Sequence, residues 1–318
     1  MGLPRGMILP DGTLDERLIA RREPLYTGMN GSRVERLRLT VGGSFIFKPL
    51  TNDGQWGSEL WVYEHILPYF PPLYPRLLAS SIDSRQGRHW LLFEDLGSLD
   101  HTFREETAAQ LIQHMAWWHG FPTGALRNGP LKGPKPPIGV LAAEISANEE
   151  EILRICEEIG AGLPRVQEML EMLGREESPF EQAKVLSHGD LHAGNYAVAG
   201  GRLLVLDWEH MHLNSPFWDL YHALDMSHPT FPGMMNEPVR ERLLDSYLAA
   251  AGECGMRHDA EPFKRAYALY AAVFSLWMLR LIDGDIRRGS GLWPMSALLR
   301  QRQETAASLL QCLERMTG

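Results

Sequence analysis

The hydrophobic periodicity of the sequence changes near residue 95, and this change constrains the fold more than any other feature. Before it, short runs of β-branched and aromatic residues alternate with glycine turns such as Gly42-Gly43, a pattern typical of strands. One helix is expected at 57–70, with Ser58 as its cap, because apolar residues recur there at helical spacing. The predicted strands lie within 24–40, 44–50, 76–83 and 89–96.

After residue 96 the chain reads as long amphipathic or apolar helices joined by loops. These helices are predicted at 104–120, 142–160, 238–252 and 263–282, and a last one extends to about residue 316. A glycine- and proline-rich stretch, 120–139, cannot form a regular element and is predicted to be a long surface loop. The pattern predicts an α+β fold of two lobes: a sheet-rich N-lobe with one helix, 1–95, and a larger, mostly helical C-lobe, 96–318.

Charge and cysteine content exclude several classes of protein. The net charge of −9 argues against nucleic acid as a partner, since such binding relies on clustered Lys and Arg. The three cysteines lie far apart without metal-ligand spacing, which favours a reducing, cytoplasmic setting. The longest apolar run, 266–279, is shorter than the roughly 18 residues of a membrane span. It is predicted to be a buried core helix, and no membrane partner is expected.

A polar cluster interrupts the helical half at "VLSHGDLHAGNYAV", residues 185–198. It leads into a predicted hairpin whose turn is 199–201, and Asn195 and Asp207 stand symmetrically about that turn. Asp190 precedes the hairpin. Antiparallel pairing is expected to bring the three side chains together. Two carboxylates and an amide at one point suit phosphoryl transfer, which needs a group to orient the attacking hydroxyl and oxygen ligands for magnesium.

These residues also resemble a known family. The run from His188 to Asn195 and the segment Leu206-Asp207-Trp208-Glu209 resemble the H-G-D-x-x-x-x-N and D-W/F-E segments of the aminoglycoside phosphotransferase and choline kinase superfamily, which is related to the protein kinases. The resemblance implies a protein-kinase-like fold and transfer of the ATP γ-phosphate to a hydroxyl. It assigns Asp190 to orienting the acceptor, His188 to shaping the catalytic loop, and Asn195 and Asp207 to binding Mg²⁺.

The N-lobe offers the remaining parts of such a kinase in the expected order. By resemblance, Lys48 binds the ATP phosphates, and Glu59 on the next helix is its ion-pair partner in preference to Glu64. The adenine is expected against the linker of Phe93, Glu94 and Leu96. A phosphate loop is expected around Gly28, Gly31 and Ser32, although its pattern is not a G-x-G-x-x-G. The resemblance covers roughly residues 25–225.

Three further residues near the motifs are not assigned a single catalytic role. Glu209 either supports the metal or the acceptor, or is a solvated turn residue. His192 is expected to be a loop residue rather than a metal ligand. Asp219, in "PFWDLYHAL", is expected to be structural.

The acceptor is predicted to be cationic as well as hydroxylated, such as an aminoglycoside or an amino alcohol. The acidic balance of the chain, a glutamate-rich helix at 144–158, and Trp208 and Trp218 beside the metal-binding motif support this hypothesis. A solvated acidic face and two core tryptophans are the alternative interpretation of the same residues.

Two other functions stay open. A kinase fold kept as a binding or structural protein without catalysis would have the same architecture. A metal-dependent phosphoesterase would use histidines such as those of "GDLH" and of "HMH" at 210–212, but Tyr196 follows Gly194-Asn195 where that class needs His.

Overall fold

The computed structural model describes residues 2–28, 30–124, 126, 129–173, 180, 183–289, 291 and 293–317. Their contacts group the chain into two units. The first unit contains Met1–Asp100, Leu126–Lys132 and Ala197–Met211, and the second contains His101–Ala125, Gly133–Tyr196 and His212–Gly318. The units differ from the predicted lobes in that two later segments of the chain are grouped with the N-terminal sheet.

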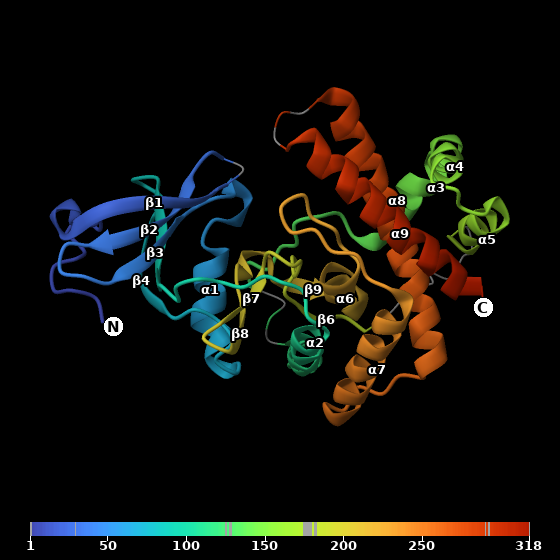
Figure 1. Cartoon of the computed structure of the whole chain (residues 1–318). Helices are drawn as coiled ribbons and strands as arrows, with labels where there is room; N and C mark the ends of the chain where they lie inside the picture. The colour runs from blue at the N-terminus through green and yellow to red at the C-terminus, as the bar shows by residue number, and fades with distance from the viewer. Residues whose placement is uncertain are drawn as a thin grey trace. The chain divides into compact units, whose positions relative to one another are not determined.

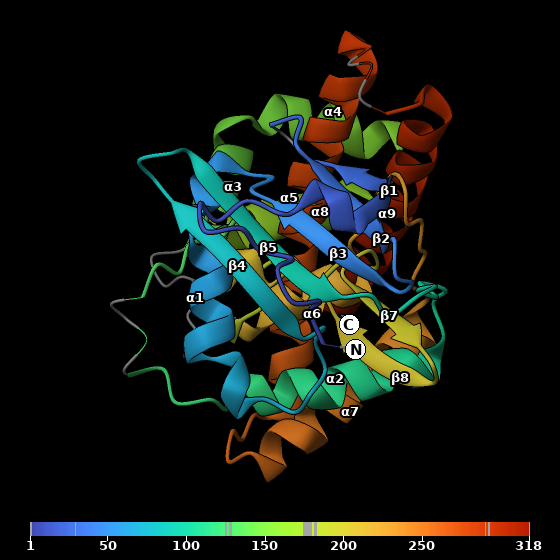
Figure 2. The same ribbon diagram turned by 90° about the vertical axis from the view of Figure 1, so that its left-hand side faces the viewer.

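The first unit is built on a five-stranded antiparallel sheet in the order β1-β2-β3-β5-β4 (Figure 2). Each predicted strand segment contributes to it. Alternation along β3 points Phe45 toward a hydrophobic cluster on one face and Lys48 toward the other face. The strands are β1 (Ile19–Thr27), β2 (Arg33–Leu39), β3 (Ser44–Pro49), β4 (Leu77–Asp83) and β5 (Arg88–Glu94).

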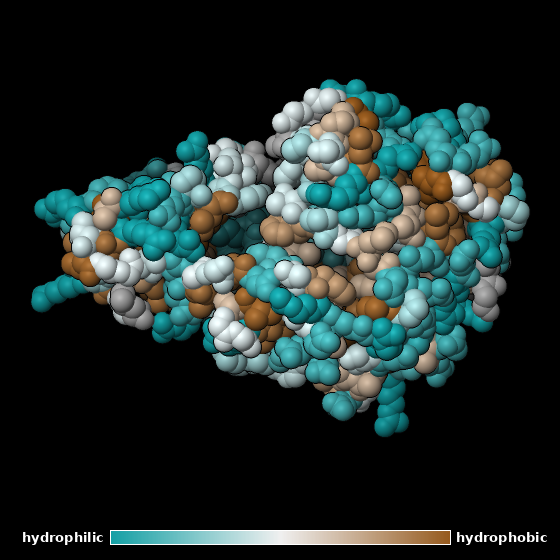
Figure 3. All heavy atoms as spheres, in the orientation of Figure 1, coloured by the Kyte–Doolittle hydropathy of each residue, from teal (hydrophilic) through white to brown (hydrophobic). Residues whose placement is uncertain are grey.

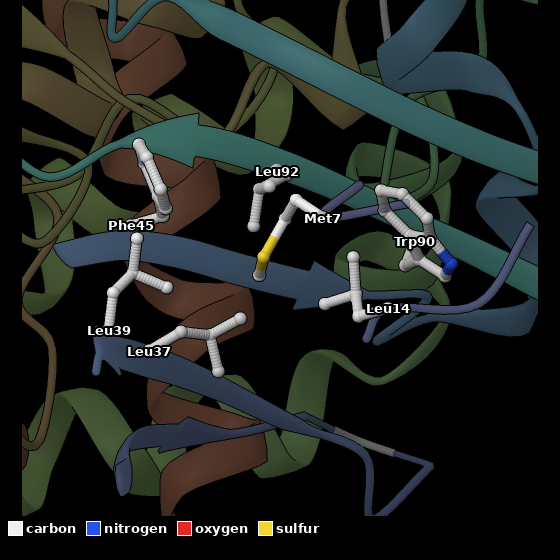
Figure 4. Packing of buried hydrophobic residues seen from close by; sticks show 7 residues of the cluster. All are labelled: Met7, Leu14, Leu37, Leu39, Phe45, Trp90 and Leu92. Carbon is white, nitrogen blue, oxygen red and sulfur yellow. The ribbon is translucent and has the colours of Figure 1, made fainter. Parts of the chain in front are cut away.

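The hydrophobic cluster on the first face is completed by residues that precede the sheet in sequence. Figure 4 shows Met7 and Leu14 packed among side chains from β2, β3 and β5. Trp90 closes one end, and its indole N–H donates to the carbonyl of Gly12 at 3.2 Å. The N-terminal segment therefore covers a sheet face that would otherwise be apolar and exposed. The buried members are Met7, Leu14, Leu37, Leu39, Phe45, Trp90 and Leu92.

Helix α1 (Ser58–His65) packs on the opposite face of the sheet. Its Tyr63 ring lies 5.3 Å from that of Phe93 on β5, and its Glu59 pairs with Lys48 on β3. The predicted cap at Ser58 is wrong, because Gly57 is the N-cap residue and has a φ of 73°. A residue with a side chain rarely adopts this left-handed conformation, so glycine suits the position.

The second unit is helical, and all the predicted helices occur in it. The acidic stretch expected as one helix is two, since Asn148 leaves helical geometry between them. Helices α5 and α6 were not predicted. The helices are α2 (Glu105–His119), α3 (Ile138–Ala147), α4 (Glu149–Glu158), α5 (Leu163–Leu173), α6 (Pro216–Leu224), α7 (Glu237–Glu253), α8 (Ala260–Arg288) and α9 (Met295–Thr317).

Two small sheets frame the polar cluster noted in the sequence. The predicted hairpin is formed by β7 (Tyr196–Ala199) and β8 (Arg202–Val205). In the second unit, β6 (Val185–Ser187) pairs antiparallel with β9 (His212–Asn214). The segment between β6 and β7 carries the motif residues 188–195.

Helix α8 is the core helix predicted from the long apolar run, and it lies beside α9 (Figure 1). By length and composition alone it is able to cross a membrane, but 78% of its most apolar 18-residue window is buried inside the structure. On the face drawn in Figure 3, hydrophilic residues predominate and apolar ones form small groups. Both observations are typical of a core helix in a protein with a polar surface.

A buried ion pair ties the helices of the second unit together. Asp225, which follows α6, accepts hydrogen bonds from the Arg240 guanidinium of α7 at 2.5 to 3.0 Å. The hydroxyls of Tyr267 on α8 and Ser308 on α9 donate to the same carboxylate. One carboxylate thus links the end of α6 to three other helices. Since all these partners are buried, removal of the Asp225 carboxylate leaves the positive charge of Arg240 without a counter-ion.

We expect Asp225→Asn to lower the free energy of unfolding by about 3–5 kcal/mol, because it leaves the Arg240 guanidinium buried without a counter-ion. Urea unfolding measures the change. The control is Glu105→Gln, which breaks the exposed pair with Arg242 and should barely alter stability. Equal stability of the two variants would show that the buried pair is not a major cross-link.

Candidate functional site

The loop between β6 and β7 is held from beneath by the carboxylate of Asp219 on α6. Asp219 is fully buried and accepts hydrogen bonds from the last residue of β6 and from the first two residues of the loop. The donors are the Ser187 hydroxyl at 2.6 Å, the His188 amide at 2.7 Å and the Gly189 amide at 3.0 Å. The backbone at the start of the motif is therefore fixed to α6 by one side chain.

Two more donors reach Asp219 from α2. The Trp118 indole donates at 3.2 Å, and His119 Nε2 lies at 3.3 Å. Burial by itself raises the pKa of Asp219, but the hydrogen bonds from His119 and Ser187 outweigh it and hold the pKa well below its usual range. The carboxylate is ionised and fully coordinated by donors, which is the structural role predicted for it.

Asp190 is positioned by the hydrogen bonds of its own loop. Its amide donates to His188 Nδ1 at 3.3 Å, and its carbonyl accepts from the Asn195 side-chain nitrogen at 2.7 Å. Gly189 just before it has a φ of 93°, a conformation that favours glycine. His192 Nδ1 accepts from the Gly194 amide at 3.0 Å, as expected of a loop residue. His188 thus orients the loop through hydrogen bonds.

The side-chain amide of Asn195 has a defined orientation. Because its nitrogen donates to Asp190, its oxygen is the atom suited to a hard cation. Asn195 and Asp190 belong to the second unit, whereas Asp207 belongs to the first. Joint binding of magnesium by Asn195 and Asp207 therefore stays a prediction from the sequence.

In the first unit, Lys48 lies among three carboxylates. Its ammonium nitrogen is 2.6 Å from Glu59, 2.5 Å from Asp207 and 3.1 Å from Glu209. Of the two glutamates considered on α1, Glu59 is buried and paired, while Glu64 is exposed. Glu209 is also buried, so the interpretation as a solvated turn residue is wrong.

Burial and charge oppose each other in this cluster. Burial lowers the pKa of Lys48, but the charges of Asp207, Glu59 and Glu209 raise it well above its usual value. Burial raises the pKa of Glu59 to about 7, against the opposing charge of Lys48. Lys48 is therefore a permanent cation, and it does not neutralise all the surrounding negative charge.

The same cluster has the donor chemistry of a magnesium site. Glu59, Asp207 and Glu209 each offer a carboxylate oxygen, and these atoms lie within 4.8 Å of one another. Hard oxygen ligands with an excess of negative charge are what Mg²⁺ prefers. Asp207 has a φ of 61°, the only positive value for a non-glycine residue in the described part of the chain. Backbone strain of this kind is often kept at functional sites.

The expected phosphate loop is a tight turn around Ser32. The Gly28 amide donates to the Ser32 carbonyl at 2.8 Å, and the Ser32 amide donates to the Asn30 side chain at 3.0 Å. Asn30 also donates to the Leu50 carbonyl at 2.9 Å, which ties the turn to the end of β3. Sequence reasoning missed Asn30, and Met29 of this loop lies outside the described residues. Phosphate binding by Ser32 stays a prediction.

The expected adenine linker follows β5. Phe93 is buried against Tyr63, and the Glu94 amide donates to the Arg76 carbonyl at 3.0 Å. The Glu94 carboxylate pairs with Arg76 as well, at 2.9 Å. The amide of Glu94 is thus engaged within the protein. An adenine contact at residues 93–96 stays a prediction.

The tryptophans and glutamates that supported a cationic acceptor are buried in the core or paired with arginines. Trp208 and Trp218 are fully buried, so neither presents an indole face. In the glutamate-rich stretch, Arg280 pairs with Glu144 and Glu151, and Arg302 pairs with Glu158. The two tryptophans are core residues, as in the alternative interpretation, whereas these three glutamates are held in ion pairs and are not simply a solvated face.

The histidines considered for a phosphoesterase are also engaged within the protein. His210 Nδ1 lies 3.0 Å from the Gln55 side-chain nitrogen, and His212 Nε2 lies 2.8 Å from that of Asn214. Both rings already hold a side-chain amide, and a metal site at 210–212 stays an expectation from the sequence alone.

We expect Asp219→Asn to loosen the catalytic loop, because an amide nitrogen then faces backbone donors and about 1–3 kcal/mol is lost for each buried donor left unpaired. Hydrogen–deuterium exchange at the His188 and Gly189 amides should accelerate, measured on the peptide that contains both. Ser187→Ala removes one donor only and should change the exchange much less. Unchanged protection in Asp219→Asn contradicts the role given to this carboxylate.

Comparisons with known proteins agree with the architecture. A family model described as the phosphotransferase enzyme family matches residues 61–263. A search of curated proteins finds no significant match. Among solved structures, the fold is similar to a putative aminoglycoside phosphotransferase from Ralstonia eutropha, with a TM-score of 0.57 and 14% identity over 94% of this chain and 95% of that one.

Two further solved structures have the same fold. One is the GDP and kanamycin complex of APH(2")-IIIa, with a TM-score of 0.57 and 15% identity over 91% of this chain and 94% of the other. The second is a choline/ethanolamine kinase family protein from Mesorhizobium loti, with a TM-score of 0.55 and 14% identity over 95% and 94%. The sheet-rich N-terminal region and helical C-terminal region match these kinase-like folds. Because the family model matches more than half of the sequence, this chain belongs to the phosphotransferase enzyme family.

Proposed function

We propose that this protein is a small-molecule kinase that transfers the γ-phosphate of ATP to a hydroxyl of a small acceptor. The observation that carries the proposal is the cluster of buried Lys48, Glu59 and Glu209 with half-buried Asp207 in a member of a phosphotransferase family. The desolvation cost of gathering three carboxylates about one ammonium offsets much of the Coulombic gain, so stability alone is a weak reason for this cluster. Such a cluster is suited to polyphosphate and its cation.

The first unit supplies the groups for nucleotide and metal. Lys48 is proposed to bind the ATP phosphates, with Glu59 holding its ammonium in place. Asp207 and Glu209 are proposed to bind magnesium, which when present neutralises phosphate charge. The adenine is proposed to lie against 93–96, and the turn at Ser32 to approach the phosphates.

The second unit supplies the groups for the acceptor. Asp190 is proposed to accept a hydrogen bond from the acceptor hydroxyl and to orient it for attack, with Asn195 as a further magnesium ligand. The loop that carries both is fixed by Asp219 and His188, so the carboxylate is held before substrate arrives. Positioning of this kind accounts for much of the rate in phosphoryl transfer.

A cationic acceptor remains part of the proposal. The net charge of −9 supports it, and so does the fold shared with a kanamycin complex and with a choline/ethanolamine kinase family protein. The buried tryptophans and the paired glutamates do not contribute. A carboxylate outside those pairs would have to bind the amine.

We expect Asp190→Asn to lower kcat about 1000-fold with nucleotide affinity nearly unchanged, since it removes the acceptor-orienting group. Asp207→Asn should weaken Mg-ATP binding as well as kcat, because it removes a metal ligand. Coupled ADP release and calorimetric titration of a non-hydrolysable ATP analogue separate the two effects. Glu64→Gln, exposed on α1, is the control. Near-normal turnover in Asp190→Asn would falsify the assignment.

The charge of the acceptor is tested separately by comparing kcat/KM for kanamycin or choline with that for a neutral hydroxyl analogue. We expect the cation to be preferred, and its advantage to shrink as salt rises, because ions screen attraction at an acidic surface. A preference for the neutral compound at low salt refutes the cationic acceptor and leaves the kinase proposal intact.

A further inference from the structure

A lysine that no motif contains reaches the catalytic loop of the second unit. Lys135 belongs to the glycine- and proline-rich stretch, 55 residues before Asp190 in sequence. Its ammonium nitrogen lies 3.0 Å from Asp190 Oδ1. The side chain is 19% exposed and that of Asp190 is 21% exposed, so the pair is sheltered rather than a surface contact.

A buried histidine holds the same ammonium on its other side. His222 Nε2 lies 3.1 Å from Lys135 Nζ, and His222 Nδ1 lies 2.7 Å from the Trp218 carbonyl. A carbonyl only accepts, so Nδ1 carries the proton and Nε2 is the acceptor for Lys135. Burial, assisted by the charge of Lys135, lowers the pKa of His222 to about 3. The ring is therefore a neutral acceptor throughout the physiological range.

Packing fixes the histidine ring itself. It stacks on Trp218 with ring centroids 5.2 Å apart and meets Phe274 edge-on at 5.5 Å. The Trp218 indole in turn donates to the Gly189 carbonyl at 2.7 Å. Trp218 therefore connects the His222 ring to Gly189, the residue that precedes Asp190. This connection fixes the Lys135 ammonium relative to the Asp190 carboxylate.

The backbone that carries Lys135 is also restrained. Its neighbours are Pro134, Pro136 and Pro137, and each proline fixes its own φ while Pro136 disfavours helical geometry at Lys135. Gly133 lies against the His212 ring, where an added Cβ would come 2.7 Å from Nε2. A stiff segment seated closely on the fold loses less entropy when it holds a long side chain in one place.

We propose that Lys135 is a positioning residue of the phosphotransfer site, holding Oδ1 of Asp190 so that the carboxylate meets the acceptor hydroxyl in one orientation. The inference rests on the function proposed above, because it assigns Lys135 to act through Asp190. It also gives the glycine- and proline-rich stretch a function, which is to deliver a fixed cation to the catalytic loop. His222 orients Lys135 and does not transfer a proton.

Lys135→Met tests the proposal, with Lys132→Met, an exposed lysine of the same stretch, as the matched control. Hydrolysis of Mg-ATP with water as acceptor, and phosphorylation of kanamycin and choline, are measured by ADP release. We expect kcat to fall about 100-fold in Lys135→Met, as for a misplaced reacting group. The ATP KM and the unfolding temperature should stay at their wild-type values, and Lys132→Met should match the wild type throughout.

Three further measurements separate positioning from a purely structural role. Lys135→Arg should recover part of the lost kcat, and added methylammonium should raise kcat in Lys135→Ala in a saturable manner. His222→Phe keeps the stacked ring without the acceptor, and combining it with Lys135→Met should cost no more than Lys135→Met alone. Wild-type kcat in Lys135→Met, or a loss that follows only the unfolding temperature without amine rescue, overturns the inference. A wild-type protein that releases no ADP with water, kanamycin or choline instead overturns the proposed function.

Discussion

The carboxylate of Asp219 is the group on which the loop from His188 to Asn195 depends. This fully buried carboxylate accepts hydrogen bonds from the amides of His188 and Gly189 and from side chains of α2. The Ser187 hydroxyl at the end of β6 donates to it as well, so one carboxylate connects a helix, a loop and a strand. A buried carboxylate is tolerated only when donors surround it, and each donor here belongs to an element that must be correctly folded. The loop is therefore ordered by the core beneath it, before any ligand is present.

In the first unit, the charges around Lys48 do not balance as those around Asp219 do. Around Lys48 the carboxylates exceed the ammonium in number, and burial raises the pKa of Glu59 against the opposing charge of Lys48. At Asp219 and at Asp225 the buried charge is matched by donors, which stabilises the fold. Excess negative charge at one place and balance at the others is the difference on which the proposed ligand site at Lys48 rests.

Much of the architecture could be predicted because it depends on local pattern. Strands, most helices and the hairpin follow from periodicity and turn residues, and the Lys48–Glu59 pair was predicted from the family resemblance. The N-terminal cover over the sheet, with Met7 and Leu14, has no such signal, because isolated apolar residues show no period. Helix α6 was missed because nearly all of it is buried, so it has no polar face to mark a helical period. For Trp218 the sequence left a ligand-facing and a core position open, and the structure shows the core position.

Sequence alone established the family motifs, the order of the chemical groups and the division into strand-rich and helix-rich parts, since these depend on residues close together in the chain. The sequence left open which of the polar and aromatic side chains would stabilise the fold rather than bind a ligand. Tertiary structure decided that Trp208 and the paired glutamates stabilise the protein, that Glu209 is buried beside Lys48, and that Lys135 reaches Asp190. The physical reason is that burial and long-range pairing depend on how distant segments pack, and neither leaves a period or spacing in the sequence.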